Sequence, residues 1–84
     1  MFYVYILRSL KDDSFYVGMS ADPLGRLAKH NRKHRGYTAR KQPWILVYEE
    51  MLESKEDALK RESEIKKQKS RQYIIDLIAS GSVG

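Results

Sequence analysis

Two short apolar runs near the beginning of the chain constrain its fold more than any other feature. The first contains Tyr3-Val4-Tyr5 and the second contains Tyr16-Val17-Gly18, and valine and tyrosine are typical of half-buried strands. The segment between them, residues 9–14, contains the serines and aspartates that favour turns. This pattern predicts a β-hairpin.

Tyr5 and Tyr16 of this hairpin have two alternative roles. Side chains alternate along a strand, so in one register the two tyrosines are near neighbours. Their hydroxyl groups would then meet beside Gly18, where the missing side chain lets another group approach the backbone. Aromatic pairs across strands also stabilise a sheet on their own, so a purely structural pair is the alternative.

The length of 84 residues suits one domain with one modest core. We expect a single domain over residues 1–80 and a flexible tail over residues 81–84. No apolar run approaches the ~20 residues of a membrane span and no secretory signal is visible, so no membrane partner is expected. The chain has no cysteine, which excludes disulfides and thiolate zinc sites and makes a cytoplasmic location the default expectation.

The charge of the chain is unevenly distributed. The net charge is +5, and no acidic residue occurs between Asp22 and Glu49. That interval contains Arg26, Lys29, Arg32, Lys33, Arg35, Arg40 and Lys41. Such a segment favours a polyanionic partner, with nucleic acid as the leading candidate. An acidic protein, a membrane surface and a plain solvated face are the alternatives.

Asp22-Pro23 predicts the start of a helix that continues to about His34, where Gly36 would end it. A stripe at three- and four-residue spacing predicts the buried face, namely Leu24, Leu27, Ala28 and Asn31. The opposite side would then present Arg26, Lys29, His30 and Lys33. After this helix we expect a basic loop from Tyr37 to Pro43 and a strand from Trp44 to Tyr48.

A second helix is predicted to begin after Ser54, with Ala58, Leu59 and Ile65 on its buried side. Glu62 falls within that apolar stripe. A carboxylate buried without a partner costs several kcal/mol, so Glu62 must be protonated, pair with a cation or bind a metal.

Ser70 predicts the start of a last helix, Arg71 to Ala79, with an apolar face that packs on the sheet. All segments together predict an α/β fold of the α+β kind. It has a three-stranded, largely antiparallel sheet flanked by three helices, in the order β-β-α-β-α-α.

Five polar residues in this scheme suit the hydrolysis of a phosphodiester bond: Tyr5, Tyr16, Arg26, His30 and Glu62. A carboxylate can hold one divalent cation, an arginine can neutralise the charge of the transition state, and a phenol or imidazole can move protons.

The chain resembles the GIY-YIG nuclease domains, whose name describes two short strand motifs. These correspond to Tyr3-Val4-Tyr5 and Tyr16-Val17-Gly18. The resemblance continues through the helix that contains Arg26 and His30, the Gly36-Tyr37-Thr38 loop, Pro43-Trp44 and the Ala58–Glu62 segment. The chain departs from the family pattern at Tyr3, where the family name has glycine, and at Met19, where some relatives have lysine.

The resemblance implies that Glu62 is the ligand of one magnesium or manganese ion and that Arg26 holds the scissile phosphate. Tyr5 and Tyr16 would flank the nucleophilic water, with Tyr5 favoured as general base, and His30 would relay a proton or contact phosphate. The wall against the sugar-phosphate backbone would consist of Lys29, Lys33, Arg35, Tyr37, Arg40 and Lys41.

The resemblance therefore implies a metal-dependent endonuclease or nicking nuclease acting on DNA, structure-selective and used in DNA repair or recombination. RNA is not excluded as a substrate. A partner protein would supply specificity, and the chain would be a monomer or weak dimer. A non-catalytic nucleic-acid-binding module and a protein-interaction domain are the alternatives.

Overall fold

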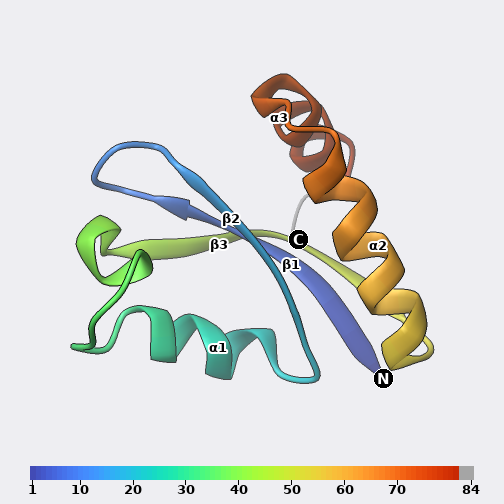
Figure 1. The fold of residues 1–84 in the computed structure, drawn as a ribbon, viewed down its shortest axis with the longest axis horizontal. Coiled ribbons are helices and arrows are strands. Elements are labelled where there is room, and N and C mark those ends of the chain that lie inside the picture. The colour runs from blue at the N-terminus through green and yellow to red at the C-terminus, as the bar shows by residue number, and fades with distance from the viewer. Residues whose placement is uncertain (82–84) are drawn as a thin grey trace.

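The computed structural model describes residues 1–81 (Figure 1). Its elements are β1 (Phe2–Ser9), β2 (Phe15–Ser20), α1 (Pro23–His30), the 3-10 helix η1 (Thr38–Lys41), β3 (Trp44–Leu52), α2 (Lys55–Lys67) and α3 (Arg71–Ser80). The predicted α+β fold and the element order β-β-α-β-α-α are confirmed. No helix in the described residues is long and apolar enough to cross a membrane. Most of the predicted tail, residues 82–84, lies outside them.

The sheet has the order β2-β1-β3, and both pairs of strands are antiparallel. The predicted hairpin forms, with Tyr5 opposite Gly18. Strand β3 is longer than expected, since it continues beyond Tyr48 to Leu52. The additional residues pair with the first half of β1, where Phe2 lies opposite Leu52. This pairing outweighs the low strand preference of the two glutamates within it.

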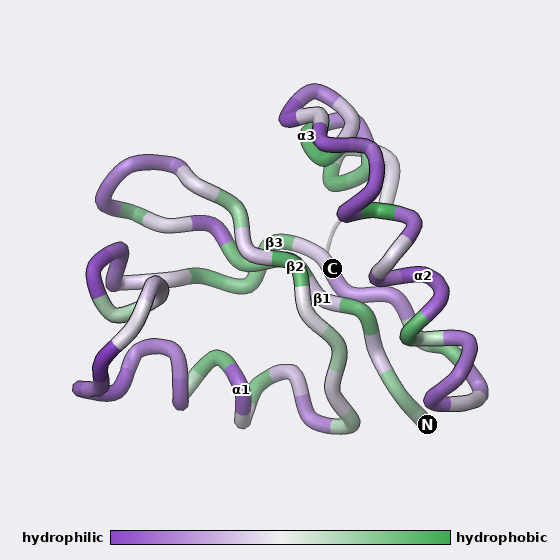
Figure 2. The backbone as a smooth tube through the Cα atoms, viewed as in Figure 1, coloured by the Kyte–Doolittle hydropathy of each residue, from purple (hydrophilic) through white to green (hydrophobic). Residues whose placement is uncertain are grey.

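The two faces of the sheet belong to different cores. Val4 and Ile6 of β1 point into a core shared with α2 and α3, whereas Tyr5 and Leu7 point into a core shared with α1. Figure 1 shows α1 below the strands and α2 and α3 on their other side. In Figure 2 the strands are mainly hydrophobic, and the segment that follows α1 is hydrophilic. Because strand side chains alternate, Tyr5 faces α1 and its basic surroundings.

Helix α1 begins as predicted, with the Asp22 carboxylate accepting a hydrogen bond from the Gly25 amide at 3.1 Å. It ends at His30, so the predicted end at His34 is wrong. The Asn31 amide pairs instead with the backbone of Trp44: its Nδ2 donates to the Trp44 carbonyl at 2.9 Å, and the Trp44 N–H donates to its Oδ1 at 2.6 Å. Gly36 has the expected positive φ of 115°, but within the loop beyond the helix.

The predicted buried face of α1 is also wrong. Leu24 is 67% exposed and Ala28 is exposed, while Pro23 is buried and Leu27 and His30 are partly buried. The helix therefore turns His30 toward the sheet, on the same face as Leu27. Spacing alone did not identify this face, because His30 packs against tyrosine rings as an apolar residue would.

Helices α2 and α3 follow the prediction more closely. Ala58 and Ile65 are buried, but Leu59 is 46% exposed, which corrects its assignment to the buried stripe. Helix α3 runs to Ser80, one residue beyond the predicted end. Its apolar face packs on the core as expected, through Tyr73, Ile74, Leu77 and Ile78.

Candidate active site

Two tyrosines and a histidine form a compact cluster between the sheet and α1. The Tyr5 and Tyr16 ring centroids lie 6.3 Å apart, and those of Tyr16 and His30 lie 4.6 Å apart. The Tyr5 hydroxyl forms a hydrogen bond with Nε2 of His30 at 3.4 Å. Trp44 extends the cluster, with its ring edge-on to Tyr16 at 6.3 Å. The sheet register thus makes the two tyrosines near neighbours. The His30 imidazole of α1 lies next to both of their rings.

The surroundings of Tyr5 and His30 favour their uncharged forms. Burial, followed by the charge of Tyr16, raises the pKa of Tyr5 to about 12, and the charge of Arg26 opposes this shift. Burial also lowers the pKa of His30 below 6.5, and electrostatic interactions with His34 and Arg26 lower it further. At neutral pH the cluster therefore pairs a protonated phenol with a neutral imidazole, whose free nitrogen lone pair can accept a proton.

Arg26 and Glu62 act on this cluster through their charges. Arg26 and His30 line the same pocket, and the charge of Arg26 lowers the pKa of both Tyr5 and His30. Glu62 contributes to the raised pKa of Tyr5 although it comes from α2. The charges of Arg26 and Glu62 thus have opposite effects on the pKa of Tyr5.

The Glu62 carboxylate pairs with Lys66, whose Nζ lies 2.9 Å from its Oε2, and its side chain is 18% exposed. Of the alternatives for a carboxylate on the apolar stripe, Glu62 therefore pairs with a cation, Lys66, which lies one helical turn away and balances its charge. Glu64, two residues further along α2, is 64% exposed and points outward as expected.

The described residues contain no group of three histidine, aspartate or glutamate side chains that could hold a metal together. Glu62 is a single hard oxygen donor. That fits magnesium, which keeps several of its waters and is commonly held by one or two carboxylates. Lys66 is 54% exposed and can turn away, so a divalent cation could replace it at Glu62.

A pocket of about 410 Å³ opens beside the cluster, at the C-terminal end of α1. It is lined by Arg26, Lys29, His30, Arg32, Lys33, His34 and Thr38. Lys29 and Lys33, two of the predicted nucleic-acid contacts, lie here, whereas Arg35, Tyr37, Arg40 and Lys41 do not line it. Sequence reasoning missed Arg32, His34 and Thr38 as site residues. All three belong to the acid-free segment, and Thr38 also belongs to the Gly36-Tyr37-Thr38 loop of the family resemblance; these were the available signals.

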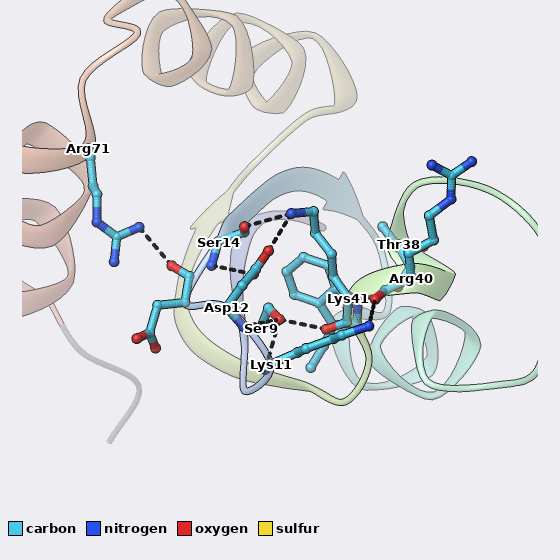
Figure 3. Close-up of polar contacts among 10 residues, drawn as sticks. Ser9, Lys11, Asp12, Ser14, Thr38, Arg40, Lys41 and Arg71 are labelled. Atoms are coloured by element: carbon cyan, nitrogen blue, oxygen red, sulfur yellow. Dashed lines mark hydrogen bonds and ion pairs between the residues drawn. The ribbon is translucent and has the colours of Figure 1, made fainter.

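Lys41 takes part in a different arrangement (Figure 3). Its ammonium pairs with Asp12 and donates to the Ser14 hydroxyl at 3.1 Å, while the Ser9 hydroxyl donates to the Lys41 carbonyl at 2.6 Å. The hydrogen bond from Lys41 holds the pKa of Asp12 well below its usual range. The charge of Lys41 is thus neutralised in fastening the β1–β2 turn to η1, which does not favour its predicted role as a phosphate contact.

The other members of the predicted wall are accessible. Lys29, Lys33, Arg35, Tyr37 and Arg40 are all exposed, and they lie on α1, on the loop that follows it and on η1. The exposed basic residues thus follow one another along the chain from α1 into η1, and a polyanion is the partner that they suit.

The fold and this site define a small basic α+β domain with a tyrosine–histidine cluster between its sheet and α1. The chain belongs to the GIY-YIG family: the model of the GIY-YIG catalytic domain matches residues 1–74. That family consists typically of endonucleases that act on DNA and generally use divalent metal ions.

The similar proteins include a UPF0213 protein of Staphylococcus saprophyticus, which is 45% identical over 80 residues and covers 94% of this chain and 95% of its own length. A UPF0213 protein of Staphylococcus haemolyticus is 46% identical over 65 residues, with 76% of this chain and 78% of its own covered. Staphylococcus aureus has another, 48% identical over the same shares. Comparison with solved structures gives no match.

Proposed function

We propose that this protein is a metal-dependent endonuclease or nicking nuclease that hydrolyses DNA phosphodiester bonds. One observation supports it above all: Tyr5, Tyr16 and His30 converge within hydrogen-bonding and ring-contact distance, beside the charge of Arg26. Membership of a family of DNA endonucleases supports the same conclusion.

In the proposed mechanism Arg26 binds the scissile phosphate and neutralises charge that develops on its oxygens. Tyr5 and Tyr16 orient the attacking water. Tyr5 is a poor base by itself because its pKa is about 12. Its hydroxyl, however, can pass its own proton to the neutral Nε2 of His30 while its oxygen takes the proton of the water. The water oxygen then bonds to phosphorus as the bond to the leaving oxygen breaks.

Glu62 would hold the divalent cation of this mechanism. The bound cation would supply charge neutralisation at the phosphate and the leaving oxygen. For this to happen, the Lys66 ammonium must leave the carboxylate that it contacts at 2.9 Å.

Lys29, Lys33, Arg35, Tyr37 and Arg40 form the proposed DNA-binding surface. Contacts of lysine and arginine with the backbone position DNA without reading sequence, and they weaken as salt rises. Because the surface consists of only these few residues, it suits the recognition of DNA shape better than that of sequence. We therefore propose structure-selective cleavage with a role in repair or recombination.

The test uses labelled DNA in duplex, nicked and branched forms, an RNA of the same sequence and a supercoiled plasmid, each with magnesium or manganese. Wild type should cut at least one DNA, and Glu62→Ala and Tyr5→Phe should cut it much more slowly. Glu64→Gln is the matched control, since Glu64 is an exposed glutamate of the same helix. If wild type cuts every substrate no faster than Glu62→Ala does, the catalytic proposal fails.

The second candidate is a nucleic-acid-binding module without catalysis. The ion pair of Glu62 with Lys66 favours it, because this contact gives the carboxylate a structural role. Such a module would bind DNA or RNA in a salt-sensitive way in the presence of a chelator and would cut none of the substrates.

A further inference from the structure

The pocket at the end of α1 brings together four cations. Arg26, Lys29, Arg32 and Lys33 line it, and within residues 1–81 none of them forms an ion pair with a carboxylate. Elsewhere in the described residues, Arg8, Lys41, Arg61 and Lys66 do pair with acidic residues, and the pocket stands out because its four cations line one cavity. Like charges that gather without counterions repel each other, so an anion in the pocket would be bound favourably.

The end of a helix normally opposes anion binding, because its last carbonyls carry partial negative charge. Here those carbonyls already have donors. Nε2 of Gln42 donates to the carbonyls of His30 and Arg32, both at 2.6 Å, and His34 lies 3.3 Å from the His30 carbonyl. The last carbonyl of α1, that of His30, thus already has hydrogen-bonding partners where the cations gather.

The wall of the pocket is held by the fold. Thr38 is almost fully buried, and its hydroxyl lies 3.3 Å from Nε2 of His34. The Trp44 indole donates to the Thr38 carbonyl at 2.8 Å, which fixes η1 against the start of β3. A ligand therefore meets a positioned wall on one side and mobile lysine and arginine heads on the other.

The charge of the pocket indicates which phosphate it suits. An internal phosphodiester carries one negative charge, whereas a terminal phosphate monoester carries about 1.5 to 2 at pH 7. Because Arg26 is assigned to the scissile phosphate, Lys29, Arg32 and Lys33 remain, and three cations exceed the need of a single diester and match a dianion better. His30 lines both the pocket and the tyrosine cluster, so a phosphate bound here would lie next to the proposed site of cleavage.

We propose that this pocket binds the terminal phosphate of a DNA strand, at a nick, gap or free end. This inference rests on the proposed function and names its substrate class: DNA with a phosphorylated end close to the bond that is cut. Arg32 and Lys33 contact the terminal phosphate, while Arg26 holds the scissile one.

The experiment measures DNA binding by fluorescence anisotropy. It uses the full-length protein with the Glu62→Ala substitution, so that the DNA is not cut during the measurement. The probes are nicked duplexes that differ only in a phosphate or a hydroxyl at the 5′ or the 3′ side of the nick. We expect tighter binding of one phosphorylated form, by roughly tenfold, as for a charge-assisted contact. Arg32→Gln should remove most of this preference, and Lys60→Gln, which changes an exposed lysine of α2, should retain it.

Equal affinity for phosphate and hydroxyl ends, including an equal lack of binding, would overturn the proposal. A deoxynucleoside monophosphate is a further probe: if it binds as tightly as the phosphorylated nick, the pocket is a free-nucleotide site and the assignment to DNA ends is wrong.

Nicking of a supercoiled plasmid, which has no ends, tests the proposed function separately. A plasmid-cutting enzyme without end preference would thus refute only the inference about the pocket.

Discussion

The phenol of Tyr5 lies directly over Gly18, its partner on the neighbouring strand. A Cβ atom at Gly18 would come within 2.7 Å of the Tyr5 hydroxyl oxygen and 2.8 Å of its Cζ. The group that approaches this glycine is therefore the tyrosine side chain itself. The glycine gives the hydroxyl the room that it needs to reach His30.

Gly18→Ala should displace the Tyr5 ring. Because the new methyl group overlaps a buried ring, we expect a loss of about 1 to 3 kcal/mol in the free energy of unfolding. If the hydroxyl moves by about 1 Å, the cleavage rate should fall by about 100-fold. Urea unfolding and single-turnover cleavage measure the two effects.

The control for this variant is Gly81→Ala. A Cβ there would lie 3.2 Å from a ring carbon of Tyr48, far from the tyrosine–histidine cluster. It should change stability slightly and leave cleavage as in wild type. A Gly18→Ala protein that cuts at the wild-type rate would show that the position of the Tyr5 hydroxyl does not matter for catalysis.

The lowered pKa of His30 predicts how activity depends on pH. The proposed mechanism needs neutral His30, so cleavage should decline on the acid side with a midpoint below 6.5, the ordinary histidine value. The folded state binds this proton less tightly than the unfolded chain. The associated stability is therefore present above pH 6.5 and is lost as pH falls through the folded pKa.

Two variants check this assignment. His34→Gln removes a neighbouring positive charge and should move the acid midpoint upward, toward the ordinary value. His30→Gln should abolish the acid limb along with most of the activity. NMR titration of the imidazole signals identifies the group directly, and an acid limb that persists unchanged in His30→Gln would contradict the prediction.

The sequence was sufficient for the hairpin and for Glu62, since both follow from local periodicity. Alternation allowed Tyr5 and Tyr16 to be neighbours in one register of the hairpin, and helical spacing predicted Glu62 among Ala58 and Ile65, which are buried. The observed register brings the two tyrosines together, and Lys66, one turn away, balances the carboxylate.

The sequence was insufficient where distant segments decide the structure. The end of α1 depends on Asn31, which pairs with a backbone thirteen residues away in β3. The orientation of α1 depends on the packing of His30 against Tyr16, which a hydrophobic pattern does not register. The neutralisation of Lys41 depends on Asp12, across the fold at the hairpin turn. Each is a polar or aromatic tertiary contact that no local period encodes.

Asn31 should act as a positioning residue for His30. Asn31→Ala removes both hydrogen bonds to Trp44 and leaves a buried backbone N–H without its partner, at a cost of about 1 to 3 kcal/mol. Because His30 directly precedes this anchor, we expect kcat to fall while KM for DNA stays close to wild type. If Asn31 had a purely structural role, its loss would lower the fraction of active protein and leave the acid midpoint of the pH profile unchanged. If Asn31 positions His30, its loss should shift this midpoint.

Gln72→Ala is the control for Asn31→Ala. Gln72 also makes a side-chain hydrogen bond, to Asp76 at 2.9 Å, but on the exposed side of α3. This variant should retain the wild-type kcat and pH profile. Identical pH profiles for Asn31→Ala and wild type would contradict the positioning role.

Lys66→Gln should lower the magnesium concentration needed for half-maximal cleavage, because Lys66 competes with the metal for the Glu62 carboxylate. Surface ion pairs contribute about 0.2 to 1 kcal/mol, so we expect a decrease of up to about fivefold. Lys67→Gln is the matched control: it removes an exposed charge from the next residue of α2 and should leave the metal dependence unchanged. If both variants need as much magnesium as wild type, the ion pair does not compete with the metal. If both need more, the general positive charge of α2 contributes to DNA binding, and Glu62 is not the residue that the metal shares with Lys66.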